Sequence, residues 1–365
     1  MRKISYIYKT FIAVALLVGV YACEREDGEP KLDTKTFSRL YVSFEEYSTS
    51  SAAKPLVNVR IIYPADSSTF NFALAHTSSA KGGGPIYFNP YLKTLFQGSA
   101  NRDGILDTAV YFMNIGVNTG LLSNNGRMGN RYYDFVKGFG YESGSETFFI
   151  VNGQGENAGI YLVYRPLSKN GYARPFKKLR NSGLTMSGGV YASKNFFTVN
   201  TAAKAGGIYV FEDIINTEIN LADSIGKLNP TRTIAIPDAR NLRDLAYDSV
   251  KNILVVADVV DTAVAGSGRI LIFEKFSEKI KESVIEPTRI ITGVKTLLRE
   301  PTSVAIDNRS TGQYIYVADR WTKMIMRFKI SDSGDVEPDK SVSTEAQGRP
   351  VGLALDTRDA STLGQ

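Results

Sequence analysis

The chain has 365 residues, of which 43% are hydrophobic and 22% are charged, and its formal net charge is +6. This balance excludes a chain that is disordered in bulk, because it supplies ample apolar material for a core. The 19 Phe, 20 Tyr and 32 Gly are typical of aromatic strands joined by tight turns, so they predict an all-β protein. The basic residues are scattered and no recognisable nucleic-acid module accompanies them, which argues against nucleic-acid binding.

Residues 1–22 have the pattern of a secretory signal peptide, because Arg2 and Lys3 precede an uncharged run from Thr10 to Ala22. That run would span only about 20 Å as a helix, against roughly 30 Å of bilayer hydrocarbon, so a transmembrane anchor is disfavoured. The sequence Val20-Tyr21-Ala22-Cys23 resembles the lipobox of bacterial lipoproteins, in which the cysteine is acylated. We therefore predict lipidation (palmitate) at Cys23. The alternative is a chance cysteine beside an ordinary secretory signal.

The next segment, residues 23–37, is predicted to be the lipidated cysteine followed by a flexible acidic tether. Its sequence EREDGEP, Glu24 to Pro30, resembles the surface-export signal of Bacteroidota lipoproteins. The resemblance implies an outer-membrane location facing the exterior. Periplasmic-facing anchorage is the alternative, since any solvated tether is charged and polar. The remaining residues, 38–365, are expected to form one domain.

An internal repeat organises that domain. Phe-Phe-x-Val-Asn at residues 148–152 and Gly-Ile-Tyr at 159–161 both return after 48 residues, at 196–200 and 207–209. Further copies show the same order of parts: an apolar strand, a turn, a second strand, a third strand ending in an aromatic residue, and a variable stretch closed by proline. Four short strands per unit are the plan of a β-propeller blade.

Complete units begin near five residues, which are Pro85, Gly138, Gly188, Arg243 and Thr302. The start of the domain lacks a first strand, whereas its end carries only a first strand, VGLALD. We expect these two ends to combine into one blade, which closes the ring and removes an open sheet edge. The prediction is a six-bladed β-propeller. Seven blades are the alternative, because residues 98–136 are irregular.

The pattern RP-x-G-x-A-x-D, YVAD and FK between Asn241 and Asp356 resembles the NHL and gluconolactonase-like group of six-bladed propellers. In gluconolactonase-like enzymes, Glu, Asn and Asp side chains hold a divalent cation at the channel. The resemblance implies that an enzyme of this type would use Glu156, Asn200, Asp258 and Asp319 as metal ligands. Ca²⁺ or another hard cation would suit these oxygen ligands, and no other cofactor is expected.

Propeller ligands usually gather at the mouth of the central channel, which is formed by the loop entering the innermost strand and the loop joining the second and third strands. The expected ligand-binding residues there are Asn152, Gln154, Glu156, Asn200, Asp258, Asp261, Asp319, Arg320 and Trp321. For Asp258 and Asp319 the competing interpretation is a carboxylate that caps the backbone of a tight turn. No catalytic residue is predicted: His76 is the only histidine, and no Ser-His-Asp signature accompanies it.

We therefore expect a binding or scaffold module for a glycan or an outer-membrane protein partner. The rival hypothesis is a divalent-metal-dependent lactonase or similar hydrolase with its site at the channel. A third possibility is a structural subunit that docks into a larger complex through exposed apolar loops such as Thr119 to Phe135. The sequence alone names neither the ligand nor the reaction.

Overall fold

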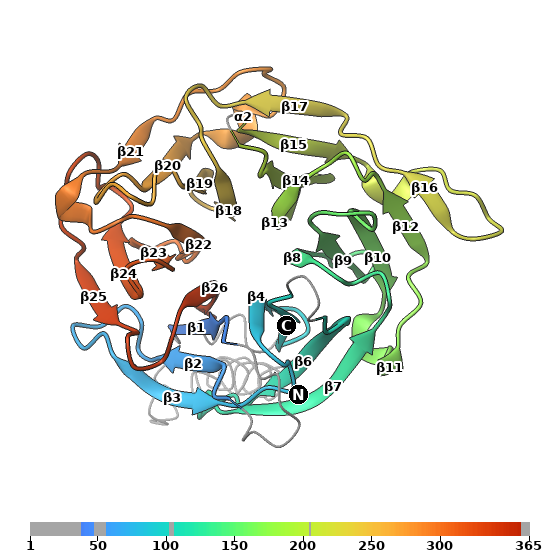
Figure 1. The fold of residues 1–365 in the computed structure, drawn as a ribbon, viewed down its shortest axis with the longest axis horizontal. Helices are drawn as coiled ribbons and strands as arrows, with labels where there is room; N and C mark the ends of the chain where they lie inside the picture. The colour runs from blue at the N-terminus through green and yellow to red at the C-terminus, as the bar shows by residue number, and fades with distance from the viewer. Residues whose placement is uncertain (1–37, 47–55, 102–105, 204–205, 359–365) are drawn as a thin grey trace, which may run out of the picture. The chain divides into compact units, whose positions relative to one another are not determined.

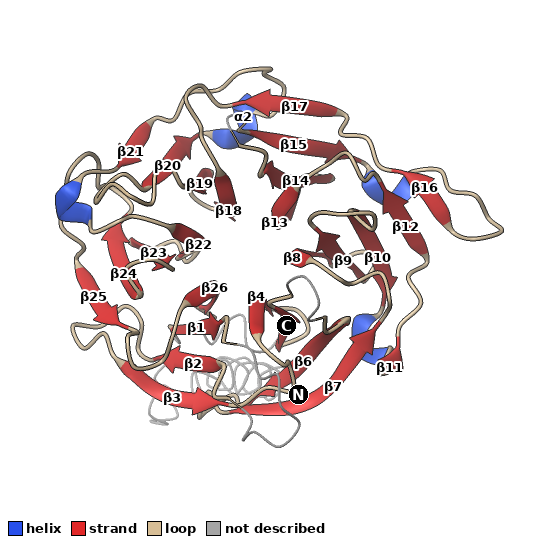
Figure 2. Ribbon diagram, in the orientation of Figure 1, coloured by secondary structure: helices blue, strands red, loops and turns tan. Residues whose placement is uncertain are grey.

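A computed structural model describes residues 38–46, 56–101, 106–203 and 206–358 of the chain. In this part of the chain six antiparallel blades stand around a central channel (Figure 1). Strands make up almost all of the regular structure (Figure 2). The all-β, six-bladed propeller is therefore confirmed and the seven-bladed alternative is wrong. The predicted signal peptide, Cys23, the tether and residues 359–365 lie outside the described residues.

Ring closure follows the prediction from the two incomplete ends of the domain. Blade 1 takes its innermost strand from the C-terminal part of the chain and its other strands from the N-terminal part. Leu40 of β1 pairs with Leu355 of β26, and Val42 pairs with Leu353. From the channel outward, blade 1 consists of β26 (Pro350–Asp356), β1 (Arg39–Phe44), β2 (Val59–Ile62) and β3 (Phe72–His76).

Blades 2 and 3 are four-stranded units to which a short parallel strand is added at the outer edge. Blade 2 consists of β4 (Gly83–Asn89), β5 (Thr94–Ser99), β6 (Ala109–Ile115) and β7 (Leu122–Gly129), with β11 (Gly171–Tyr172) outside. Blade 3 consists of β8 (Val136–Glu142), β9 (Thr147–Asn152), β10 (Gly159–Tyr164) and β12 (Lys177–Arg180), with β16 (Ile225–Lys227) outside. The segment expected to be an apolar loop, Thr119 to Phe135, thus contains the strand β7.

Blades 4, 5 and 6 have the four strands of the predicted repeat. Blade 4 consists of β13 (Met186–Ala192), β14 (Asn195–Asn200), β15 (Gly207–Glu212) and β17 (Arg232–Ala235). Blade 5 consists of β18 (Leu242–Asp248), β19 (Ile253–Asp258), β20 (Arg269–Glu274) and β21 (Arg289–Ile291). Blade 6 consists of β22 (Pro301–Ile306), β23 (Tyr314–Asp319), β24 (Met324–Lys329) and β25 (Lys340–Ser343). Each first strand begins within two residues of its predicted start.

The core is divided into six main clusters, and each cluster fills the space between two adjacent blades. For example, Phe148 of blade 3 packs with Phe96 of blade 2 at 4.4 Å between ring centroids. On the other face of the same sheet, Phe149 stacks on Phe196 of blade 4 at 4.7 Å. Because successive residues of a strand point to opposite faces, a strand covered on both sides must be apolar throughout. This requirement explains the repeated Phe-Phe phrase.

Short helical turns connect the outer strands. They are η1 (Pro166–Ser168), η2 (Ile214–Asn216), α2 (Phe276–Lys279) and η3 (Val294–Thr296). The first three follow the third strand of a blade, each after a residue in the left-handed conformation: Arg165, Asp213 or Lys275. None of the helices formed by the described residues is long and apolar enough to cross a bilayer.

Candidate functional site

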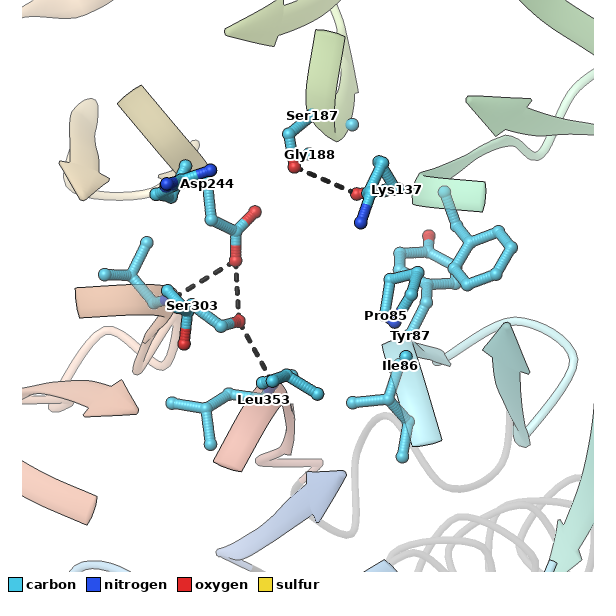
Figure 3. A pocket seen from close by; sticks show the side chains of 18 of the residues that line it. Pro85, Ile86, Tyr87, Lys137, Ser187, Gly188, Asp244, Ser303 and Leu353 are labelled. Carbon is cyan, nitrogen blue, oxygen red and sulfur yellow. Dashed lines mark hydrogen bonds between the residues drawn. The ribbon is translucent and has the colours of Figure 1, made fainter. Parts of the chain in front are cut away.

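The central channel forms a cavity of about 930 Å³, lined by the innermost strands of the six blades. These strands are β26, β4, β8, β13, β18 and β22. Figure 3 shows Lys137, Asp244, Ser303 and Leu353 arranged around this space. All six strands begin at the same end of the channel, as repetition of one blade around an axis requires. Side chains at the strand starts therefore share one mouth.

Every innermost strand is irregular near its start. In β8 and β18 the pairing register shifts across one residue, which is Lys137 in β8 and Arg243 in β18. Thr302 of β22 and Val351 of β26 occupy the same place in their strands. Such β-bulges commonly redirect a side chain next to a functional site. Here they place residues of the strand start among those that line the cavity.

In blades 2 and 4 the corresponding stretch contains glycine. Gly188 and Gly189 lie between the paired residues Ser187 and Val190 of β13. Gly188 has a positive φ of 69°, and a Cβ there would collide with Leu245 of the next blade. The mouth is therefore lined by backbone at blade 4, between Lys137 of blade 3 and Arg243 of blade 5. No side chain of Gly188 or Gly189 fills the space between the two cations.

A network of charged side chains forms the opposite wall of the mouth, on blades 6 and 1. Arg320 donates two hydrogen bonds to the carboxylate of Glu45, at 2.8 and 2.9 Å, and a third to Glu300 at 3.2 Å. Arg349 approaches Glu45 at 3.3 Å, and its backbone N–H donates to Glu46 at 2.9 Å. We call these five residues the carboxylate wall. Its arginines are neutralised by their partners.

Lys137 and Arg243 differ from these arginines. Among the described residues neither side chain has a hydrogen-bond or ion-pair partner, and Nε of Arg243 is buried. Burial lowers the pKa of Lys137, and the positive charge of Arg243 lowers it further. Burial also lowers the pKa of Arg243, although nearby Glu300 opposes this. Lys137 is an exposed residue that lines the cavity.

Asp244 links three blades at the level just below the bulges. Its carboxylate accepts hydrogen bonds from the Ser303 hydroxyl at 2.6 Å and from the Val304 N–H at 3.1 Å, both on β22. The Ser303 hydroxyl in turn accepts a hydrogen bond from the Leu353 N–H on β26 at 3.0 Å (Figure 3). Burial raises the pKa of Asp244 to about 6, against the lowering effect of these hydrogen bonds.

The sequence placed nine residues at the mouth, and only two of them, Gln154 and Arg320, line the cavity. Glu156 and Asp261 are exposed outside it, and Asp261 caps the Ala263 N–H at 2.9 Å. Trp321 is half exposed, and the Arg299 guanidinium lies 4.8 Å from its ring centroid. These three side chains belong to the surface around the mouth and do not line the channel.

The other four predicted residues are each the last residue of a second strand. Asp319 accepts hydrogen bonds from the N–H groups of Arg299, Glu300 and Thr322 at 2.6, 2.8 and 2.9 Å. Asp258 accepts from the Arg240 and Asn241 N–H groups at 3.0 and 2.8 Å.

The remaining bonds of these strand-end residues have the same local character. Asp258 pairs with Arg269 of its own blade. Asn152 accepts from the Phe135 N–H at 2.8 Å, and Asn200 accepts from the Ala202 N–H at 3.0 Å. All four strand-end side chains therefore bind backbone within their own blades, as the capping interpretation expects.

This geometry does not fit a cation shared by Glu156, Asn200, Asp258 and Asp319. Both oxygens of Asp258 and of Asp319 already accept hydrogen bonds from the protein, and Glu156 is not among the cavity-lining residues. In the part of the chain that the structure describes, no group of three or more His, Cys, Asp or Glu side chains could hold a metal ion.

Sequence reasoning missed Lys137, Arg243, Asp244 and Ser303. All four lie on first strands, whereas the candidates named from the sequence stand at the ends of second strands or in the loops that follow them. The available signal was the interruption of an apolar strand start by a charged pair, Arg243-Asp244 in the sequence LRDLAYD. A bulge inserts one residue and has no further sequence mark, so the pairing register was needed to see it.

No protein-family model and no curated protein sequence matches the chain. Solved structures do match in fold. The periplasmic gluconolactonase PpgL of Pseudomonas aeruginosa is 12% identical with a TM-score of 0.57, over 88% of this chain and 99% of that one. A putative 6-phosphogluconolactonase of Bacteroides fragilis is 11% identical with a TM-score of 0.56, over 90% and 99%.

A chain of a nidogen/laminin complex is 14% identical with a TM-score of 0.53, over 87% of this chain and 98% of that chain. The three neighbours thus include one protein named as a gluconolactonase, one named as a putative 6-phosphogluconolactonase and one that was solved in a protein complex. At these identities the likeness concerns the fold alone. The chain is a six-bladed β-propeller whose fold is similar to that of gluconolactonase-like propellers.

Proposed function

We propose that this chain is a cell-envelope lipoprotein whose propeller binds a saccharide at the mouth of its central channel. The single observation that carries the proposal is the cavity of about 930 Å³ with charged side chains at the strand starts. Binding sites for small molecules measure roughly 300 to 1,000 Å³ and orient their ligand with a few polar groups. A small saccharide can enter and fill a cavity of this volume, whereas the flat surface of a protein partner cannot.

The chemistry of the lining supports a ligand rich in hydroxyl groups. The carboxylate wall offers oxygens that accept hydrogen bonds, and Lys137, Arg243 and Gln154 offer donors. Sugar hydroxyl groups both donate and accept, so they can use both kinds of partner. A protein partner that docks on the surrounding loops remains the other reading of a binding module.

The proposed location rests on the sequence alone. The predicted lipidation at Cys23 and the predicted acidic tether support attachment to the outer membrane, facing the exterior, with periplasmic-facing anchorage as the alternative. Protease digestion or antibody labelling of intact cells distinguishes the two orientations. Metabolic labelling with a palmitate analogue, compared between the wild type and Cys23→Ala, tests the anchor.

The test of the binding function is a glycan array probed with the full chain purified in detergent. The expected result is binding to a restricted set of saccharides that weakens at least tenfold in Arg320→Gln, because this change removes the donor that holds Glu45 and Glu300 in place. Absence of binding to any saccharide at millimolar concentration overturns the proposal. Binding that Arg320→Gln leaves unchanged moves the ligand away from the channel.

A lactonase is the second candidate function. Two observations favour it: gluconolactonases are among the proteins of similar fold, and the channel holds Asp244, whose pKa of about 6 suits a general base. Against it, both carboxylate oxygens of Asp244 accept hydrogen bonds from the protein. Hydrolysis of glucono-1,5-lactone, measured in EDTA and with Ca²⁺ and compared with Asp244→Asn, decides this question.

A further inference from the structure

We infer that Lys137 and Arg243 form an oxyanion subsite, so that the saccharide is an acidic one. Its carboxylate, phosphate or sulfate group would lie between these two cations, beside the glycine backbone of blade 4. This inference rests on the proposed saccharide function and adds the charge and the orientation of the ligand.

The first support is that the two cations have no partner among the residues that the structure describes. Of the cations among the described cavity-lining residues, Arg320 and Arg349 are bound to carboxylates, whereas Lys137 and Arg243 have neither an ion pair nor a hydrogen bond from their side chains. Nε of Arg243 is buried without an acceptor. A buried charged donor without a partner costs free energy, and a bound anion would supply the missing acceptor.

The second support is that the fold places these cations together. Both are the bulged residues of their strands, at equivalent positions in blades 3 and 5. Both line the cavity, and the charge of Arg243 lowers the pKa of Lys137, whereas the charge of Glu45 raises it. An anion between them would remove this repulsion, and hydrogen bonds between charged partners are the strong ones.

The third support is the space around Lys137. Its stem packs against Gly153, where a Cβ would collide with Cβ and Cγ of the lysine. The Lys137 carbonyl accepts a hydrogen bond from the Ser187 hydroxyl at 3.2 Å (Figure 3). These contacts hold the base of the side chain, and Gly188 and Gly189 line the same cavity beside it.

Charges of both signs therefore line the mouth, on different blades. Unpaired cations stand on blades 3 and 5, and the carboxylates of Glu45, Glu46 and Glu300 stand on blades 1 and 6. A ligand with an oxyanion at one end and hydroxyl donors at the other matches both walls. A purely anionic ligand such as inorganic phosphate satisfies only the cation side, and a neutral saccharide satisfies only the carboxylate side.

The test compares matched ligands on the full chain purified in detergent. The probes are the galacturonate trisaccharide against the neutral galactose trisaccharide, and glucose 6-phosphate and glucose 6-sulfate against glucose. We expect one acidic member to bind at least tenfold more tightly than its neutral match at low salt. The preference should shrink as salt rises to 0.5 M. Comparison of the carboxylate, phosphate and sulfate probes identifies the anion.

Lys137→Met and Arg243→Gln should each abolish the tenfold preference, because each variant removes one cation of the subsite. The matched controls are Lys281→Met and Arg174→Gln, which change exposed cations outside the cavity and should keep the preference. In the absence of ligand, Lys137→Met should melt at the same or a higher temperature, because it keeps the packed stem and removes a repelled charge. Both subsite variants must also show the wild-type circular dichroism spectrum.

Two outcomes overturn the inference and remain distinct from failure of the proposed function. If acidic and neutral saccharides bind equally well, saccharide binding stands and the oxyanion subsite falls. If the preference survives in both Lys137→Met and Arg243→Gln, the anion binds elsewhere. If no saccharide binds but sulfate raises the melting temperature more than chloride at equal ionic strength, and Lys137→Met loses this effect, the subsite stands and the saccharide function falls.

Discussion

At Asp319, the capping interpretation and the metal-ligand hypothesis predict different effects of a substitution, and the capping interpretation predicts the loss of stability. The carboxylate accepts three backbone hydrogen bonds, from the N–H groups of Arg299, Glu300 and Thr322, at 2.6, 2.8 and 2.9 Å. Each bond to a charged group contributes about 1.5 to 3 kcal/mol. Burial opposes part of this gain, because it raises the pKa of Asp319. We expect Asp319→Ala to lower the free energy of unfolding by about 3 to 5 kcal/mol.

Asp319→Asn supplies the matched comparison. The amide oxygen can still accept from Arg299 and Glu300, but the NH₂ group then faces the N–H of Thr322, so one bond is lost. This change should cost about 1 to 2 kcal/mol. The chain itself supports this tolerance, because Asn152 and Asn200 occupy the same strand-end position in blades 3 and 4.

The assay is thermal unfolding of the full chain, followed by circular dichroism and by tryptophan fluorescence. Trp321 is the only tryptophan and lies two residues after Asp319, so its fluorescence reports the turn that Asp319 caps. At about 2 °C per kcal/mol for a domain of this size, the alanine variant should melt roughly 6 to 10 °C lower. The reasoning is refuted if Asp319→Ala melts within about 2 °C of the wild type and loses a stabilisation by Ca²⁺ or Mg²⁺ that the wild type shows.

Three further predictions concern the channel and the ring. Because the pKa of Asp244 is raised from 3.8 to about 6, the folded state holds this proton more tightly than the unfolded state does. The contribution of Asp244 to the free energy of unfolding should therefore fall by up to about 3 kcal/mol as pH rises from about 4 to 7. Unfolding of the wild type and of Asp244→Ala, compared across this pH range, measures the effect, and parallel pH dependence of the two proteins contradicts the prediction. Gly138→Ala should cost about 1 to 3 kcal/mol, because its Cβ would collide with the Gly188 carbonyl of blade 4; an unchanged melting temperature would show that the blades can separate. Arg327→Met should lower the free energy of unfolding by about 3 to 5 kcal/mol, because it leaves Asp339 and two carbonyl groups of the 65–67 turn without their partner. A loss below about 1 kcal/mol, measured by calorimetry, would contradict a stabilising role of the ion pair between Arg327 and Asp339.

The ring could be predicted from the sequence because its signal is repeated. Phe148-Phe149 and Phe196-Phe197 stand at equal spacing, and both pairs are buried between blades. Closure could be predicted because an unpaired first strand at one end of the domain matches a missing first strand at the other. Such arguments need only strand order and apolar pattern, which are local properties of the chain.

The candidate site could not be predicted in the same way. Apart from the Thr322 N–H, the backbone amides that Asp258 and Asp319 bind lie 17 to 20 residues earlier in the chain. A carboxylate free to reach the channel and a carboxylate bound to its own blade therefore look alike in sequence. Lys137 was overlooked because nothing in its sequence context marks it as a site residue. A lysine at a strand start is ordinary, and only the bulge turns it toward the channel.

Ring closure and the candidate site share residues, which gives ligand binding a structural consequence. Glu45, from the N-terminal part of blade 1, is bound by Arg320 of blade 6, and its backbone N–H donates to the carbonyl of Arg349, next to the closing strand β26. The hydrogen bonds among Asp244, Ser303 and Leu353 join blades 5, 6 and 1 below the same mouth.

A ligand that engages the carboxylate wall therefore binds only the closed ring, because opening of blade 1 separates Glu45 from Arg320. By mass action, such a ligand at 100 times its dissociation constant stabilises the closed ring by about 2.7 kcal/mol. The junction of blade 1 with blade 6 should accordingly show the largest gain in hydrogen-exchange protection when ligand binds, whereas a gain confined to the β10 to β12 edge of blade 3 would place the ligand outside the channel.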